Sequence, residues 1–197
     1  MFSNGKTATI LIIFVAFMQS GCALVTVGTV GAAATVSAND RRTVGTQIDD
    51  KTTQSRVRSA INDIPLVKDE AAVSVNVYNG QVLLTGQAPL QGMIVDLEKM
   101  ATAVQNVMKV HNQVRLGSPI PATSTMNDVW LASKIKTIML ADEKIPLFKL
   151  VLVVEDSEVF IMGLLTKAEA AAAVDAARNV DGVSKVIRVM ELIPSKS

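Results

Sequence analysis

The sequence is poor in the residue types on which most catalytic, metal-binding and disulfide-stabilised proteins depend. Its 197 residues include one cysteine, one histidine and one tryptophan, and only 4% are aromatic. A single cysteine excludes an internal disulfide and a site built from several cysteine ligands. The histidine, His111, lies in a predicted strand, and no serine elbow, HExxH or phosphate-loop motif occurs. We therefore expect no enzyme activity, no metal site and no cofactor.

The sequence also lacks an excess of charge of either sign. Nineteen Lys and Arg face 18 Asp and Glu, which gives a formal net charge of +1. Proteins that bind nucleic acid neutralise backbone phosphates with many unpaired Lys and Arg. The balance of charges therefore argues against a nucleic-acid partner.

The first residues have the pattern of an export signal. Lys6 precedes the apolar run 10–18, and Gln19-Ser20-Gly21 leads directly to Cys22. This arrangement resembles the lipobox of bacterial lipoproteins, in which the cysteine is acylated and becomes the N-terminus. The resemblance implies a signal peptide over 1–21, lipidation of Cys22 and a tether over 22–45, and the absence of Asp after Cys22 implies the outer membrane. The alternative is an uncleaved membrane anchor continuing through 23–30.

The remainder of the sequence contains one pattern twice. Segments 50–61 and 128–139 align without a gap, and each opens with an aspartate that we expect to cap a helix. Each segment is followed by two strands joined by a tight turn, a second helix and a closing strand. The features that support this assignment are the turns Asn79-Gly80 and Asp156-Ser157, the second helices over 90–104 and 166–179, the capping box Thr166–Glu169, left-handed residues at Asn106 and Gly182, and closing strands over 107–114 and 183–192.

The order α-β-β-α-β and the closing pattern Val107, Val110, Asn112, Val114 resemble the BON domain. The approach run 43–50 is also similar to that of outer-membrane lipoproteins with two BON domains. The resemblance implies an α+β fold with two tandem BON domains, each a three-stranded mixed sheet packed by two helices. The expected boundaries are domain 1 over 46–116, a linker over 117–124, domain 2 over 125–193 and a tail over 194–197.

The first helix of the second copy carries the only tryptophan, Trp130, beside Lys134 and Lys136. The gapless alignment places polar residues of the first copy opposite Val129, Trp130, Lys134 and Leu140. An aromatic side chain with neighbouring lysines is typical of the interface of an anionic bilayer. Alternatively, Trp130 packs against the other domain or the linker, or occupies a groove for a protein partner. Residues 126–193 contain eight Lys and Arg against ten Asp and Glu, so any attraction to the membrane is local to this helix.

We therefore expect a non-enzymatic outer-membrane lipoprotein that faces the periplasm and supports envelope integrity. The resemblance implies binding of an anionic phospholipid membrane through the second domain. The expected contact residues, which flank or form the contact helix, are Trp130, Leu131, Lys134, Lys136 and Ile138. The rival hypothesis is a structural adaptor that binds a protein of the envelope or the division machinery.

Overall fold

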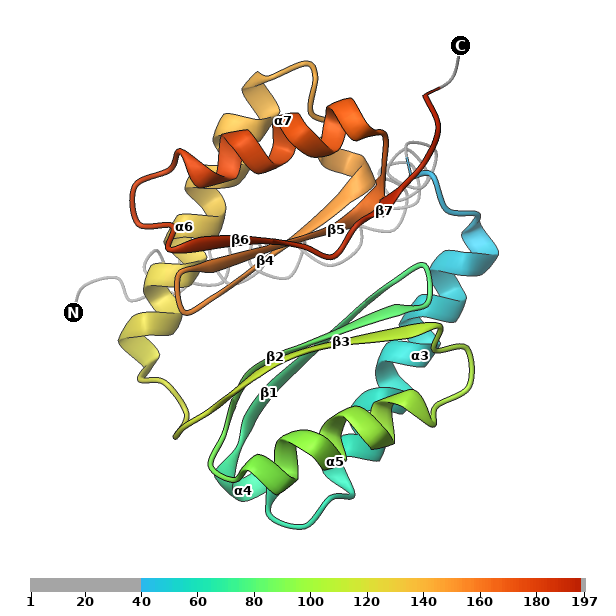
Figure 1. Cartoon of the computed structure of the whole chain (residues 1–197), viewed down its shortest axis with the longest axis vertical. Coiled ribbons are helices and arrows are strands. Elements are labelled where there is room, and N and C mark those ends of the chain that lie inside the picture. Colours follow the sequence, from blue (N-terminus) through green and yellow to red (C-terminus); the bar gives the residue numbers. More distant parts are fainter. Residues whose placement is uncertain (1–39, 196–197) are drawn as a thin grey trace, which may run out of the picture. The chain divides into compact units, whose positions relative to one another are not determined.

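The computed structural model describes residues 40–195, and the compact part of the chain begins at Asp40. The signal peptide, Cys22 and residues 23–39 of the expected tether therefore lie outside the described residues, whereas Val44 and Gly45, expected to end the tether, belong to a helix. Two repeats follow one another along the chain (Figure 1). The first repeat consists of α3 (Val44–Asn62), α4 (Val67–Glu70), β1 (Ala72–Tyr78), β2 (Gln81–Ala88), α5 (Gln91–Thr102) and β3 (Lys109–Leu116). The second consists of α6 (Ala122–Ala141), the 3-10 helix η1 (Leu147–Lys149), β4 (Leu150–Glu155), β5 (Glu158–Leu165), α7 (Lys167–Arg178), β6 (Lys185–Arg188) and β7 (Glu191–Leu192).

Both sheets are mixed, as the sequence predicts. In the first repeat the strand order is β1-β2-β3, with β1 antiparallel and β3 parallel to the central β2. In the second repeat β4 pairs antiparallel and β6 parallel with β5. The predicted closing strand over 183–192 is in fact divided into β6 and β7, which both pair with β5. The α-β-β-α-β order is therefore confirmed in both repeats, with one interrupted strand.

The hairpin turns are those that the sequence predicts. Asn79 and Gly80 have φ angles of 50° and 71°, and Asp156 and Ser157 have 47° and 63°. Two successive residues with positive φ are typical of the type I′ turn, whose twist matches that of the strands. Asn106 is left-handed as well, with φ of 70°. These local features follow from turn chemistry alone, which is why sequence reasoning finds them.

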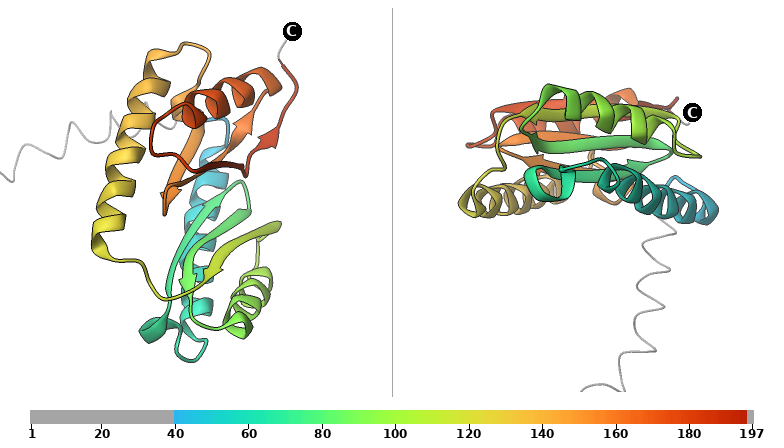
Figure 2. Two further views of the ribbon diagram at one scale, coloured as in Figure 1. Left: turned by 60° about the vertical axis from the view of Figure 1, so that its left-hand side comes forward. Right: turned by 90° about the horizontal axis from the view of Figure 1, so that it is seen from below.

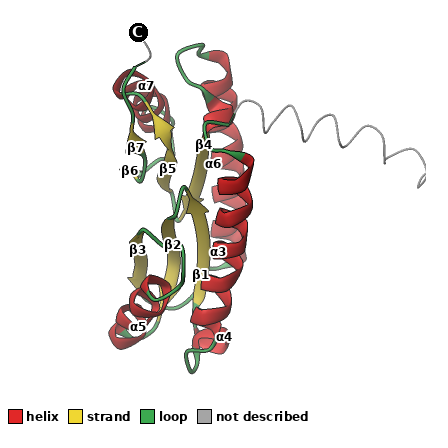
Figure 3. Cartoon of the chain, turned by 90° about the vertical axis from the view of Figure 1, so that its right-hand side faces the viewer, coloured by secondary structure: helices red, strands yellow, loops and turns green. Residues whose placement is uncertain are grey.

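Each repeat buries one face of its sheet beneath two helices (Figures 2 and 3). In the first repeat α3 contributes Val57 and Ile61, and α5 contributes Met93, Leu97 and Ala101 at intervals of four residues. This spacing keeps side chains on one side of a helix. In the second repeat α7 buries three alanines, Ala170, Ala173 and Ala177. Fully burying a large aliphatic side chain contributes about 1.5–3 kcal/mol, so these two clusters provide most of the stability.

The opposite faces of the two sheets share a third, smaller apolar cluster. Its buried members are Tyr78 and Leu83 from the first repeat and Phe160, Met162 and Val189 from the second. Alternation along the strands explains the division, because neighbouring residues of a strand point to opposite faces. Val82 and Leu84, for example, lie in the core of the first repeat, whereas Leu83 lies between the repeats. The two sheets therefore pack on each other as well as on their own helices.

The two predicted aspartate caps are wrong. Helix α3 begins at Val44 with Thr43 as its cap, and α6 begins at Ala122 after Pro121, inside the segment expected to be a linker. Asp50 and Asp128 lie within these helices and are buried. Their carboxylates accept hydrogen bonds from the backbone of the hairpin turns instead of from their own helix. A long-range contact thus decides the role of residues that look like caps.

Candidate functional site

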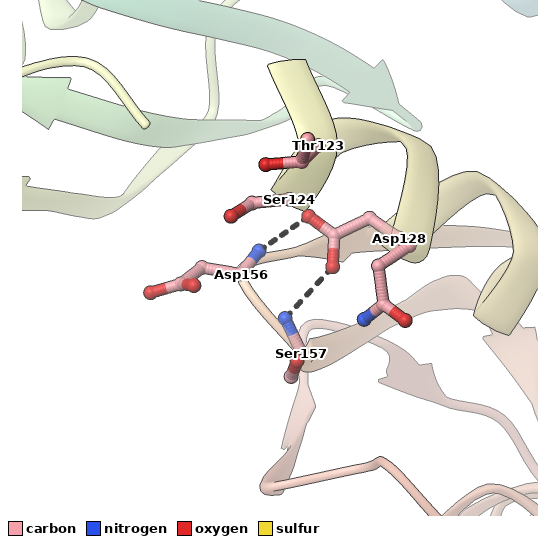
Figure 4. Close-up of a pocket in the computed structure, with 6 residues that line it drawn as sticks. Thr123, Ser124, Asp128, Asp156 and Ser157 are labelled. Atoms are coloured by element: carbon pink, nitrogen blue, oxygen red, sulfur yellow. Dashed lines mark hydrogen bonds between the residues drawn. The ribbon is translucent and has the colours of Figure 1, made fainter. Parts of the chain in front are cut away.

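The aspartates hold each hairpin against the first helix of its repeat. Asp128 accepts hydrogen bonds from the backbone N–H groups of Asp156 at 2.7 Å and Ser157 at 2.9 Å (Figure 4). Asp50 does the same for Asn79 at 2.7 Å and Gly80 at 2.8 Å. Because this device occurs at equivalent places in both repeats, it also confirms the alignment of the repeats.

The pocket around Asp128 is therefore structural. It has a volume of about 240 Å³ and is lined by Thr123, Ser124, Asn127, Asp128, Asp156 and Ser157. Both oxygens of the Asp128 carboxylate are occupied by backbone donors. Among residues 40–195 no group of three or more His, Cys, Asp or Glu is placed to hold a metal ion. Nothing in this pocket points to a metal or a substrate.

Removing the Asp128 carboxylate leaves two partly buried backbone donors without their partner. We expect Asp128→Ala to destabilise the second repeat by about 2–4 kcal/mol, because each unsatisfied donor costs about 1–3 kcal/mol. Urea unfolding followed by circular dichroism measures this loss. Asp181→Ala, at an exposed aspartate, is the control and should change little. Equal stability of the two variants would contradict the structural role of Asp128.

His111, the single histidine, pairs with a neighbouring strand. Its Nε2 lies 2.9 Å from Oε1 of Gln81 on the neighbouring strand. Burial, with a smaller contribution from the charge of Lys109, lowers the pKa of His111. The side-chain partner of the ring, among the described residues, is therefore an amide and not the hydroxyl or thiol of a nucleophile.

Helix α6 has an apolar surface on the side that faces away from the core. Leu131, Ile135 and Met139 are buried, whereas Met126, Val129, Trp130 and Leu140 are exposed. At about 100° per residue, the exposed four fall within an arc of about 100° that is centred opposite Ile135. Two hydroxyl residues lie in the same arc. We refer to the six residues of this arc as the α6 stripe: Met126, Val129, Trp130, Ser133, Thr137 and Leu140.

The two hydroxyl groups of the α6 stripe are turned toward the helix backbone. Ser133 Oγ donates to the carbonyl of Val129 at 3.0 Å, and Thr137 Oγ1 donates to the carbonyl of Ser133 at 2.9 Å. A hydroxyl group that donates to its own helix has no need of an external acceptor for its proton. The middle of the stripe is therefore less polar than its residue types imply.

Two lysines border the α6 stripe. By helical geometry Lys134 and Lys136 lie on opposite sides of it, each about 80° from the direction opposite Ile135. The Nζ of Lys134 is 5.1 Å from the centre of the Trp130 ring, which is within the range of a cation–π interaction. The arrangement places an apolar strip between two positive charges on one exposed helix face.

The structure divides the five predicted contact residues. Trp130 is 57% exposed and lies within the α6 stripe, between the flanking Lys134 and Lys136. Ile138 is 41% exposed and lies between the buried side of the helix and the α6 stripe. Leu131 is only 1% exposed and belongs to the core of the second repeat, so it is not brought to the surface with Trp130.

The alternative packing of Trp130 against the other domain finds no support. Trp130 is absent from the cluster between the sheets, and more than half of its surface is exposed. In the first repeat the positions equivalent to Val129 and Trp130 are Lys51 and Thr52, both exposed and polar. At these two positions the first helices of the repeats therefore differ as the sequence predicts.

Three exposed apolar residues of the α6 stripe, Met126, Val129 and Leu140, were not among the predicted contact residues. Met126 precedes Asp128, where the helix was expected to begin, so the helical wheel did not include it. Leu140 lies opposite the core on the same wheel and could have been chosen from the sequence. Among residues 40–195, no helix is long and apolar enough to cross a membrane.

Comparisons with known proteins agree with this architecture. The family profile described as "BON domain" matches residues 49–118 and 127–194. The chain is 35% identical over 188 residues to the outer membrane lipoprotein DolP of Haemophilus influenzae, an alignment that covers 95% of this chain and 96% of that protein. It is 36% identical over 154 residues to a 21 kDa hemolysin of Actinobacillus pleuropneumoniae, covering 78% of this chain and 79% of that protein.

A solved structure of low similarity also aligns. It is the C-terminal domain of CdsD, a structural protein of the type III secretion system of Chlamydia trachomatis, at 11% identity and a TM-score of 0.30. The alignment covers 71% of this chain and 96% of that one. A likeness at this level carries no argument about function.

Proposed function

This chain belongs to the BON-domain family as a two-domain relative of an outer-membrane lipoprotein, and from that premise we propose that it binds the surface of anionic phospholipid membranes through α6. In this proposal the protein is lipidated at Cys22, is held on the periplasmic face of the outer membrane and supports envelope integrity without catalysis. The observation that carries the proposal is the α6 stripe with its two flanking lysines.

The composition of the stripe fits a bilayer interface better than bulk water. Tryptophan is enriched at the depth of the lipid headgroups, where its ring is apolar and its N–H group is solvated. Met126, Val129 and Leu140 would contribute about 25 cal/mol for each square ångström removed from water. Each lysine close to an anionic surface contributes on the order of 1 kcal/mol. These contributions support reversible binding rather than insertion.

A lipid anchor would make such a modest contact effective. Two or more acyl chains attach a protein stably to a bilayer, whereas one chain binds only marginally. A second contact within an anchored molecule is intramolecular, and its effective concentration can reach the millimolar range. In this proposal the lipid on Cys22 keeps the protein at the membrane, and α6 gives it a preference for anionic headgroups.

The fluorescence of Trp130 tests the proposal directly, because it is the only tryptophan of the chain. A chain beginning at Asp40 contains both cores and no lipid. On titration with phosphatidylglycerol vesicles we expect the emission to shift to the blue, with little change on phosphatidylcholine vesicles. An unchanged spectrum with the anionic vesicles would overturn the proposal and favour the adaptor hypothesis, which requires a protein partner.

The flanking lysines should set the salt dependence of binding. We expect Lys134→Gln together with Lys136→Gln to weaken vesicle binding by about 2 kcal/mol at low salt, or roughly 30-fold, since each lysine contributes about 1 kcal/mol. The difference from the natural protein should shrink at high salt because exposed charges are screened. Vesicle co-sedimentation at several salt concentrations measures both effects.

A matched control removes the same charge elsewhere. Lys68 and Lys99 are exposed lysines of the first repeat. Changing both to glutamine lowers the net charge equally but leaves α6 intact. If this control weakened binding as much as the α6 variant did, attraction would depend on net charge rather than on the α6 face.

A further inference from the structure

The three residues that precede α3 contact both repeats. Arg41 reaches the second repeat, where its Nη1 donates to the carbonyl of Leu164 at 2.6 Å. Its two Nη atoms also bind the two carboxylate oxygens of Glu169 at 2.7 Å each. Such a two-pronged pair is among the stronger and more directional side-chain contacts. The hydrogen bonds from Arg41 are the main reason that the pKa of Glu169 falls to about 2.

Arg42 reaches the first repeat. Its Nη1 binds Oδ2 of Asp50 at 2.7 Å, and its guanidinium lies 3.8 Å from the centre of the Tyr78 ring. Asp40 holds the same guanidinium from the other side, with Nη2 to Oδ2 at 2.6 Å. Asp50 is the aspartate that also holds the hairpin. The segment is therefore tied to the interior of the first repeat.

Tyr78, the last residue of β1, contacts both this segment and the second repeat. Its hydroxyl oxygen lies 3.2 Å from Oδ1 of Asp40 and 3.2 Å from the carbonyl oxygen of Lys149 in the second repeat. Burial, followed by the negative charge of Asp40, raises the pKa of Tyr78 to about 12. The hydroxyl group is protonated at neutral pH, and its single proton can be donated to either of these two oxygens. We refer to Asp40, Arg41 and Arg42 with these contacts as the clasp.

The hairpin of each repeat also contacts the closing strand of the other repeat. At the end of the interface where the clasp lies, Asn79, which follows Tyr78, donates to Glu191 of β7 at 3.0 Å. At the other end, next to the linker, Arg115 of β3 binds Asp156 at 2.7 Å. Both contacts are partly exposed to solvent, and such pairs contribute at most about 1 kcal/mol.

The clasp itself has no equivalent at that other end. The alignment of Asp50 with Asp128 makes Arg41 and Arg42 correspond to residues 119 and 120, which are Pro and Ile of the linker. These side chains cannot donate a hydrogen bond. One end of the interface is thus closed by the covalent linker and the other by the clasp. The apolar cluster between them is small, and domains joined by a small interface are expected to move relative to each other.

We infer that Asp40, Arg41 and Arg42 are positioning residues that lock the second repeat against the first. The segment that leads to the proposed lipid anchor is thereby part of the folded body, and it enters at the junction of the repeats. The second repeat, and α6 with it, is held in one orientation relative to the first repeat and to Asp40. The inference concerns the arrangement of the repeats and does not depend on lipid binding.

The distance between the repeats tests the inference. Spin labels on Val95→Cys in α5 and Ala171→Cys in α7 occupy exposed sites of the two repeats. The full chain carries Cys22→Ser so that no third label attaches, and pulsed electron resonance in detergent gives the distance distribution without lipid vesicles. We expect one narrow distribution in this parent chain. We expect Arg41→Gln with Arg42→Gln to add a broad population at other distances.

Single and matched variants keep the test decisive. Arg41→Gln alone removes only the contacts to Leu164 and Glu169, which spares the hairpin contacts of the first repeat. Arg41→Lys should give an intermediate width, because a lysine restores the charge but not the paired geometry. Arg56→Gln with Arg58→Gln removes two exposed arginines of α3 and should leave the distribution narrow. An Arg41→Gln distribution identical to that of the parent chain would overturn the inference.

Discussion

Trp130→Glu should bind phosphatidylglycerol vesicles about 100-fold more weakly than the natural protein. The substitution removes the largest apolar side chain of the α6 stripe and places a negative charge against anionic headgroups. Losing most of the burial of one aromatic side chain costs about 2 kcal/mol, and the repelled charge adds about 1 kcal/mol. A total of about 3 kcal/mol corresponds to roughly two orders of magnitude in affinity. Co-sedimentation of a chain beginning at Asp40 measures the loss.

The fold should survive this change, so the loss can be assigned to the surface. Trp130 is 57% exposed and is not part of any of the three apolar clusters. The matched control is Val95→Glu, which introduces the same charge at a residue of α5 that is 58% exposed. Unaltered binding of Trp130→Glu, or an equal loss in the control, would refute the assignment of the contact to α6.

Much of the fold could be predicted because its signals are local and occur twice. A two-residue turn such as Asn79-Gly80 can be predicted from its residue types, because asparagine and glycine tolerate the positive φ angles that the turn requires. The capping box at Thr166 and Glu169 is complete in the structure, with both reciprocal hydrogen bonds present. The BON pattern then supplies the order in which such elements assemble. Independent local signals that agree with one another make an assignment secure.

The errors arise where a distant partner decides what a residue does. Asp50 and Asp128 are of a residue type that caps helices and stand where a cap was expected. Their carboxylate oxygens instead accept hydrogen bonds from backbone N–H groups of turns 28–30 residues later in the chain. The helices consequently begin earlier than predicted. This shift explains why Met126 was not considered for the exposed face. A helical wheel that starts at the apparent cap leaves out the helical turn that precedes it.

Leu131 was named as a contact residue although the helical spacing that it shares with Ile135 and Met139 predicts a core face. Leu131 and Trp130 are 100° apart on the helix. In the structure the boundary between core and solvent passes between them. The clasp was not predicted at all. The contacts of Arg41 to the second repeat join residues separated by more than 120 positions, for which a single sequence has no signal.

Gly86→Ala should unfold the first repeat, with a loss of several kilocalories per mole. Both return strands carry a glycine two residues before their end, and the structure gives the reason for Gly86. Its φ is 117°, a conformation that residues with a side chain rarely adopt, and a Cβ atom there would lie 1.8 Å from the carbonyl oxygen of Ala72 on β1. Strand β1 would have to separate from β2 at the pair formed by Val73 and Gly86. Each strained residue costs about 1–3 kcal/mol, and the displaced strand adds the loss of its buried contacts.

The same substitution at Gly92 separates this steric effect from the general effect of replacing glycine. Gly92 lies in the first turn of α5, and a Cβ atom there would meet nothing within 4 Å. Alanine at this position should stabilise the helix by about 0.5–1 kcal/mol, because glycine loses more backbone entropy on folding. Urea unfolding should therefore show changes of opposite sign for the two variants. If Gly86→Ala were as stable as Gly92→Ala, the close approach of β1 and β2 at Gly86 could not be what requires a glycine there.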